Sequence, residues 1–240
     1  KEPNAENLVR TAVQAHPNHA FLQFLHFELI NDFSSLSRAI ELEARSDRKL
    51  EWLDQLLEEA DATEDRDLAK KHLLALRDSA TEDLNVLSRL TGKMQRFGFH
   101  ELGLETVLLT TKLNPSPEQQ VELEMLAAKM EAGLEKNEAA GNRLQILLAK
   151  VAPDYWRRGE IMALRVQLLD SNAARASMLD VAKVRYAETP TAEAALDLVE
   201  LLEATGLRRE AVRVLAEASE KLPHVQVLEE KALALLDRLS

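Results

Sequence analysis

LEWLDQLLEEADATEDRDLAKKHLLALRDSATED, residues 50–83, is followed directly by LNVLSRLTGKMQRFGFHELGLETVLLTTKLNPSP, residues 84–117, and both segments are thirty-four residues long. Apolar or small side chains recur at matching positions in the two segments. They are Leu53, Leu56, Leu57, Ala60, Ala69, Leu73 and Leu76 in the first, and Leu87, Leu90, Thr91, Met94, Gly103, Val107 and Thr110 in the second. Their spacing predicts two amphipathic helices per segment. Repeated helix pairs are typical of a solenoid, whose units share one continuous core.

Helical periodicity and turn residues predict thirteen helices along the chain. Their approximate ranges are 4–15, 18–31, 34–59, 64–79, 82–96, 100–113, 117–137, 139–151, 155–170, 173–187, 191–204, 207–221 and 224–238. Ser116 and Gln119 are spaced as a capping box around Pro117, a favoured first residue of a helix. Gly98 and Gly206 are predicted to end helices in the left-handed conformation.

Two hairpins carry a further pattern in their second helices: a small residue, a large apolar residue four later, a small residue three later and a proline five later. The matching residues are Ala5, Val9, Ala12 and Pro17, and then Ala211, Leu215, Ala218 and Pro223. In this pattern, and in the turn residue Gly206, the chain resembles the tetratricopeptide repeat family. The resemblance implies an all-α fold, a right-handed superhelical α/α solenoid of about six helical hairpins.

The best repeats under this resemblance are residues 50–83, 84–117 and 191–225. We expect residues 1–240 to form a single elongated solenoid. Because the chain starts at Lys1 rather than at a methionine, we also expect it to be a fragment of a longer protein. The sequence departs from the family in the long helix predicted at 34–59 and in the near absence of the family's first-helix aromatic residue.

Composition restricts the partners and the chemistry. Acidic residues outnumber basic ones by 41 to 30, and the formal charge of −11 disfavours nucleic acid as a partner. The adjacent basic pairs, which do not share a helix face, are expected to be solvated; they are Lys70-Lys71, Arg157-Arg158 and Arg208-Arg209. Cysteine is absent, so disulfides and thiolate chemistry are excluded. No apolar run approaches the ~18 residues that membrane insertion requires, and nothing indicates a compartment.

No enzyme motif is present: there is no HExxH, no phosphate-binding glycine loop, no GxGxxG and no GxSxG. His16, His19 and His26 are not spaced as metal ligands on one helix. Clustered acids such as Glu58-Glu59 flank a predicted turn, where a solvated helix cap is the simpler interpretation. We therefore expect no catalytic, cofactor or metal site. A buried pair of acids in an enclosed pocket would favour the alternative of an α/α enzyme.

Aromatic residues have two interpretations. Phe21, Phe24, Phe27 and Phe33 are expected to form core, with self-association through residues 21–33 as the alternative. Trp52 is predicted to point partly away from the Leu53 stripe. Trp52 and Trp156 are therefore candidates for either packing or a groove that anchors a peptide.

In tetratricopeptide proteins the first helices of the hairpins line a concave groove that binds partner segments. By this resemblance the groove residues are Asn85, Ser88, Gln95, Arg96, Glu160, Gln167, Asp170, Glu193, Glu200 and Glu203. Glu193, Glu200 and Glu203 are predicted to share one solvent-exposed face. Such an acidic stretch favours a basic or amphipathic segment as ligand, and the family's Lys and Asn clamp for a carboxyl terminus is absent.

The leading functional hypothesis is a non-enzymatic scaffold or adaptor that holds a protein or peptide partner within a larger assembly. Bacterial members of the family serve secretion, envelope and exopolysaccharide machineries, so the resemblance allows a bacterial envelope or secretion assembly as the setting. The alternative is a helical accessory or regulatory region of a larger enzyme or regulator, whose active part lies outside these residues.

Overall fold

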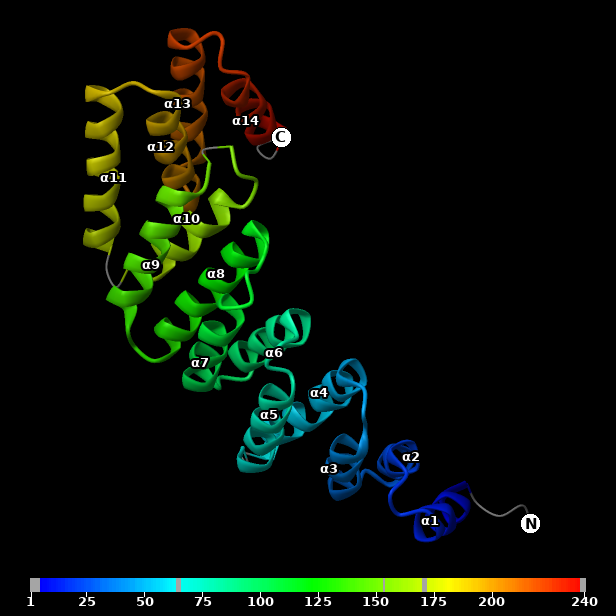
Figure 1. The fold of residues 1–240 in the computed structure, drawn as a ribbon. Coiled ribbons are helices and arrows are strands. Elements are labelled where there is room, and N and C mark those ends of the chain that lie inside the picture. The colour runs from blue at the N-terminus through cyan, green and yellow to red at the C-terminus, as the bar shows by residue number, and fades with distance from the viewer. Residues whose placement is uncertain (1–4, 64–65, 153, 170–171, 238–240) are drawn as a thin grey trace. The chain divides into compact units, whose positions relative to one another are not determined.

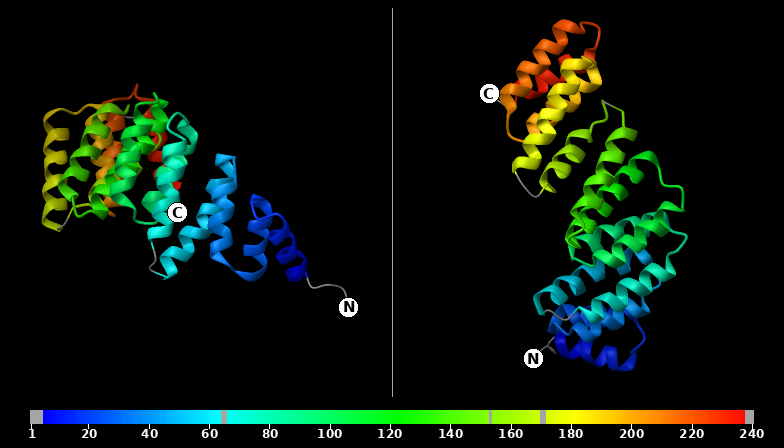
Figure 2. Two further views of the ribbon diagram at one scale, coloured as in Figure 1. Left: turned by 60° about the horizontal axis from the view of Figure 1, so that its bottom comes forward. Right: turned by 90° about the vertical axis from the view of Figure 1, so that its left-hand side faces the viewer.

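The computed structural model describes residues 5–63, 66–152, 154–169 and 172–237, and every regular element within them is an α-helix (Figures 1 and 2). The helices are α1 (Ala5–Ala15), α2 (Ala20–Ile30), α3 (Phe33–Leu42), α4 (Ser46–Thr63), α5 (Asp67–Ser79), α6 (Leu84–Arg96), α7 (His100–Thr111), α8 (Pro117–Gly133), α9 (Asn137–Lys150), α10 (Arg158–Gln167), α11 (Asn172–Glu188), α12 (Ala192–Ala204), α13 (Arg208–Lys221) and α14 (Gln226–Asp237). The prediction of an all-α protein is confirmed.

The chain forms two compact units, residues 1–130 and residues 131–240. In the first unit, consecutive helices pack in pairs, such as α2 with α3 and α6 with α7, and α4 also packs against α6. In the second unit, α12 packs against α13, and α10 packs against both α9 and α12. In both units a helix therefore contacts its neighbour in sequence and a helix two positions further along the chain.

The repeat positions of residues 50–117 form the core of the first unit. All fourteen residues that define the repeat are buried, including Gly103 and the two threonines. Thr91 and Thr110 satisfy their hydroxyl groups by donating to the carbonyls of Leu87 and Thr106, at 2.8 and 2.7 Å. Threonine can thus replace leucine in this stripe without leaving a buried hydroxyl unpaired.

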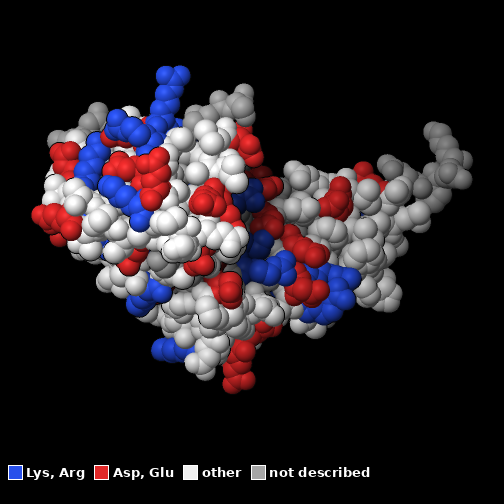
Figure 3. All heavy atoms as spheres, turned by 90° about the horizontal axis from the view of Figure 1, so that it is seen from above, with Lys and Arg blue, Asp and Glu red and all other residues white. Residues whose placement is uncertain are grey.

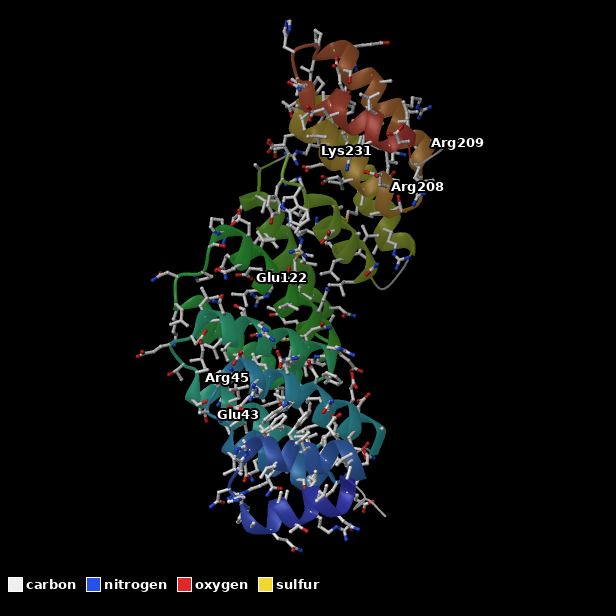
Figure 4. The ribbon with its side chains drawn as sticks, turned by 90° about the vertical axis from the view of Figure 1, so that its right-hand side faces the viewer. Glu43, Arg45, Glu122, Arg208, Arg209 and Lys231 are labelled. Atoms are coloured by element: carbon white, nitrogen blue, oxygen red, sulfur yellow. The ribbon has the colours of Figure 1, made fainter. Side chains whose placement is uncertain are left out.

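The long helix predicted at 34–59 is wrong, because α3 ends at Leu42 and α4 begins at Ser46. The break lies at Glu43, whose backbone is extended at ψ 133°. Its carboxylate accepts hydrogen bonds from the backbone N–H groups of Ala44 and Arg45, at 2.9 and 3.1 Å (Figure 4). Partial burial raises the pKa of Glu43, but these donors and Arg48 outweigh it and hold the pKa below its ordinary value. The side chain therefore caps a turn that the apolar pattern conceals.

The structure confirms the predicted capping box at Ser116 and the predicted left-handed glycines, Gly98 and Gly206. Gln119 N–H donates to Ser116 Oγ at 3.2 Å, and Ser116 N–H donates to Gln119 Oε1 at 2.9 Å, which is the reciprocal capping box. Pro117 is the first residue of α8. Gly98 and Gly206 have φ of 71° and 81°, so each turn requires a conformation that favours glycine.

The aromatic residues of α2 belong mostly to the core. Phe27 is buried and meets Phe33 edge-on, with ring centroids 4.9 Å apart. Trp52 is buried as well and stacks on Phe24 at 4.7 Å, so of its two interpretations the structure supports packing. The contact bridges α2 and α4, which the local pattern of either helix does not reveal. Phe21 is 45% exposed.

Substitution of Leu215 tests the packing between α12 and α13 in the second unit. It is fully buried on α13, which packs against α12. We expect Leu215→Ala to lower the free energy of unfolding by about 2 to 5 kcal/mol, because truncation leaves a cavity that the helices cannot close. Urea unfolding followed by far-UV circular dichroism measures the loss. Leu233→Ala is the matched control, since Leu233 is 65% exposed and its truncation should change stability by only about 0.5 kcal/mol.

Candidate partner-binding site

One cavity of the second unit contains several of the predicted groove residues. It has a volume of about 510 Å³ and lies among α10, α12, the start of α13, α14 and the segment that precedes α10. We call it the α14 cavity. Its lining consists of Asp154, Tyr155, Trp156, Gly159, Glu160, Ala163, Leu196, Glu200, Glu203, Ala204, Arg208, Val227 and Lys231. Lys231 and Arg208 are labelled in Figure 4.

Three of the residues predicted for a groove meet in this lining. Glu160 comes from α10, and Glu200 and Glu203 come from α12. The side chain of Glu160 is 55% exposed and accepts a hydrogen bond from Arg157 at 3.0 Å. Glu203 is paired with Lys231 of α14 at 3.0 Å. Among the charged residues of the lining, four acidic side chains therefore outnumber two basic ones.

The other predicted residues of this unit lie elsewhere. Glu193 is exposed, pairs with Arg185 of α11 at 3.0 Å and lines a second cavity among α9, α10, α11 and α12, which we call the α11 cavity. Glu193, Glu200 and Glu203 therefore do not share one face. Gln167 is exposed at the end of α10 and lines neither of these cavities. Asp170 lies outside the described residues.

The four candidates on α6 belong to the first unit. Asn85 is exposed, and Ser88 and Gln95 are half-buried. Arg96 is exposed and faces Glu58 of α4, 3.4 Å away, while its guanidinium lies over the ring of Phe97. These contacts give Arg96 a role in joining α4 and α6.

Glu200 is buried, so the expectation of an exposed groove residue is wrong. Its Oε2 lies 3.3 Å from Nε of Arg158, which is buried too. The expectation that the Arg157-Arg158 pair is solvated is therefore wrong for Arg158. Arg158 also donates to the carbonyl of Leu148 at 2.7 Å and to Asp197. By these bonds Arg158, the first residue of α10, ties the end of α9 to α12.

Burial changes the pKa of the Glu200 carboxyl group. Removal from water raises the pKa of Glu200 from 4.5 to about 7. Arg158 and Lys231 oppose the rise, and Asp197 and Glu203 reinforce it. A buried ion-pair cluster is sufficient to explain a perturbed carboxyl group without catalysis. We therefore interpret Glu200 as part of the cluster that orders the cavity wall.

Two buried polar atoms of the lining have no hydrogen-bond partner in the described part of the chain. They are the hydroxyl oxygen of Tyr155 and Oε2 of Glu200, whose contact with Arg158 is not aligned as a hydrogen bond. Burying an unpaired polar atom is unfavourable.

Trp156 stands at this cavity with 75% of its surface exposed. The guanidinium of Arg157 lies over its ring, 5.4 Å from the centroid. The ring therefore already accepts a cation on one face. Large exposed aromatic side chains beside a hollow are frequent anchors of protein partners.

The described ranges were compared with the requirements of metal, membrane and nucleic-acid binding. These ranges contain no group of three or more histidine or acidic residues able to hold a metal ion. Among these helices, none has the length and apolar character needed to cross a bilayer. Acidic and basic side chains are interspersed on the face shown in Figure 3, and no extended basic surface is visible there.

Comparison with known proteins assigns neither a family nor a function to this chain. No family model matches the sequence, and no curated protein matches it. The resemblance to tetratricopeptide repeats therefore rests on the residues of this chain alone.

Glu200 gives a prediction for the dependence of stability on pH. Because its folded pKa of about 7 exceeds the unfolded value of 4.5, the folded protein binds this proton more tightly. The contribution of Glu200 to stability is therefore most favourable below pH 4.5 and is lost as pH rises to about 7, a change of about 3 kcal/mol. Relative to the parent, Glu200→Gln should gain stability over this range.

Urea unfolding of the parent and of Glu200→Gln at pH 5 and pH 8 measures this difference. Comparing the two proteins cancels the titration of the other carboxyl groups. Glu160→Gln is the control, because its exposed side chain should give the same pH profile as the parent. Parallel profiles for the parent and Glu200→Gln would show that burial does not hold the Glu200 proton.

Proposed function

We propose that this chain is a non-enzymatic interaction scaffold and that the α14 cavity of its second unit receives a segment of a partner protein. The observation that carries the proposal is the combination of Trp156, an exposed aromatic side chain, with buried Tyr155 and Glu200 atoms that lack a hydrogen-bond partner among the described residues. Interfaces concentrate their binding energy in such aromatic anchors beside desolvated polar groups.

We further propose that the helices are tetratricopeptide-like hairpins of a right-handed α/α solenoid, about six in all. Two observations support this architecture. The repeat positions of residues 50–117 are all buried, and packing between helices two positions apart occurs in both units, at α4 with α6 and at α10 with α12. In a solenoid the first helices of successive hairpins pack together in this manner.

The chemistry of the lining favours a basic partner segment. Asp154, Glu160, Glu200 and Glu203 contribute four carboxyl groups, against Arg208 and Lys231. An arginine or lysine of the partner can place its aliphatic stem on the indole of Trp156 and its charge beside Glu160. Attraction between exposed charges is screened over about 10 Å at 0.1 M salt, so binding should weaken as salt rises.

The test has two variants with matched controls. The native chain first captures its partner, which is identified by mass spectrometry. We expect Trp156→Ala to weaken capture more than tenfold, since truncation of an aromatic anchor costs about 2 kcal/mol or more. Glu160→Lys should weaken capture at low salt and lose most of the effect at high salt. Both side chains are exposed, so circular dichroism should show an unchanged fold.

The controls are Leu108→Ala, an exposed apolar truncation on α7, and Glu138→Lys, an exposed charge reversal on α9. Neither residue lines the α14 cavity. Both controls should capture the partner as the parent does. Equal capture by the parent, Trp156→Ala and Glu160→Lys would exclude the α14 cavity as the binding site.

A further inference from the structure

The α11 cavity has the properties of a small-molecule site. Its volume is about 640 Å³, within the roughly 300 to 1,000 Å³ typical of ligand pockets. Apolar side chains from all four surrounding helices line it, namely Leu148, Met162, Met178, Val181 and Leu201. Val181 is 67% exposed, so the apolar lining continues to the outer surface of α11. Such a lining takes up an apolar body.

Arg165 is the one cation of this lining without an ion pair among the described residues. Arg158 and Arg185 both bind Asp197, at its two carboxylate oxygens. Arg165 is half-buried and donates one hydrogen bond, to Oε1 of Gln145 at 3.0 Å. Arginine has five N–H groups, so most of its donors stay available.

The environment of Arg165 is partly desolvated and the lining around it is positive. Burial lowers the pKa of its guanidinium, and the charge of Asp197 partly offsets this. The lining as a whole contains three arginines and two acids, Glu193 and Asp197, and is therefore positive within a chain of net charge −11. A planar guanidinium binds a carboxylate through two parallel hydrogen bonds.

We propose that the α11 cavity binds an aliphatic carboxylate, such as a medium-chain fatty acid. The aliphatic chain lies among Met162, Met178 and Leu148, and the carboxylate accepts hydrogen bonds from Arg165. A single available guanidinium matches a single negative charge, which favours a carboxylate over a phosphate dianion. This ligand and its site are independent of the partner segment proposed for the α14 cavity.

The methionines provide a direct readout. Met162 and Met178 line the α11 cavity, whereas Met94, Met125 and Met130 are buried in the first unit. With the methyl groups of methionine labelled with carbon-13, titration with decanoate should shift the Met162 and Met178 signals saturably. The other three signals should stay in place. Decanol, which has the same chain without the charge, should bind at least about tenfold more weakly.

Two variants test the charge of Arg165 and the space of the α11 cavity separately. Arg165→Met keeps the length and apolar character of the side chain, and should weaken decanoate binding at least about tenfold. Arg213→Met is the matched control, because the side chain of Arg213 is 76% exposed on α13 and does not line the cavity. Ser177→Phe places a large ring at an exposed lining position and should abolish binding without removing a buried contact.

Several results would overturn the proposal. The absence of a saturable shift at Met162 and Met178 would exclude the site. Equal affinity for decanoate and decanol, or equal affinity of Arg165→Met and the parent for decanoate, would exclude the arginine clamp. Simultaneous shifts of all five methionine signals would show non-specific adsorption. If Arg165→Met fails to fold, the comparison of decanoate with decanol and the blocking by Ser177→Phe still decide the result.

Discussion

Sharing of apolar stripes between successive helix pairs is the constraint on which the rest of the structure depends. The fourteen repeat positions of residues 50–117 are buried, and within this segment α4 packs against α6 as well as against α5. In the proposed solenoid, stability would be distributed along the chain, and each hairpin would need its neighbours.

In the second unit the same arrangement includes a buried ionic cluster. Arg158 joins the end of α9 to Asp197 and to Glu200 of α12, which the repeat resemblance had placed on an exposed face. Breaking one partner of such a cluster leaves a buried charge without compensation, whereas the intact cluster fixes how the helices meet. The walls of the α14 and α11 cavities are both built on this cluster, since Glu200 lines one cavity, and Asp197 and Arg158 line the other.

The sequence predicted what depends on local spacing. The repeat stripe, the capping box at Ser116 and the left-handed glycines follow from residues within one or two helical turns, and the structure confirms them. Other features depend on contacts between helices that are not consecutive in the chain, which local spacing does not reveal. Trp52 is buried because Phe24 of α2 stacks on it, and Glu200 is buried because Arg158 of α10 reaches it. The break at Glu43 arises from a side-chain cap inside a continuous amphipathic pattern.

The central claim is that the partner binds at the α14 cavity, and site-specific photocrosslinking tests it most directly. A photoreactive phenylalanine derivative replaces Trp156 in one protein and Leu108 in another, and both side chains are exposed. We predict that the protein carrying the probe at position 156 crosslinks to a basic segment of the captured partner, identified by mass spectrometry, and that the probe at position 108 gives no crosslink. A partner that is captured but crosslinks only from position 108, or from neither position, would contradict the account.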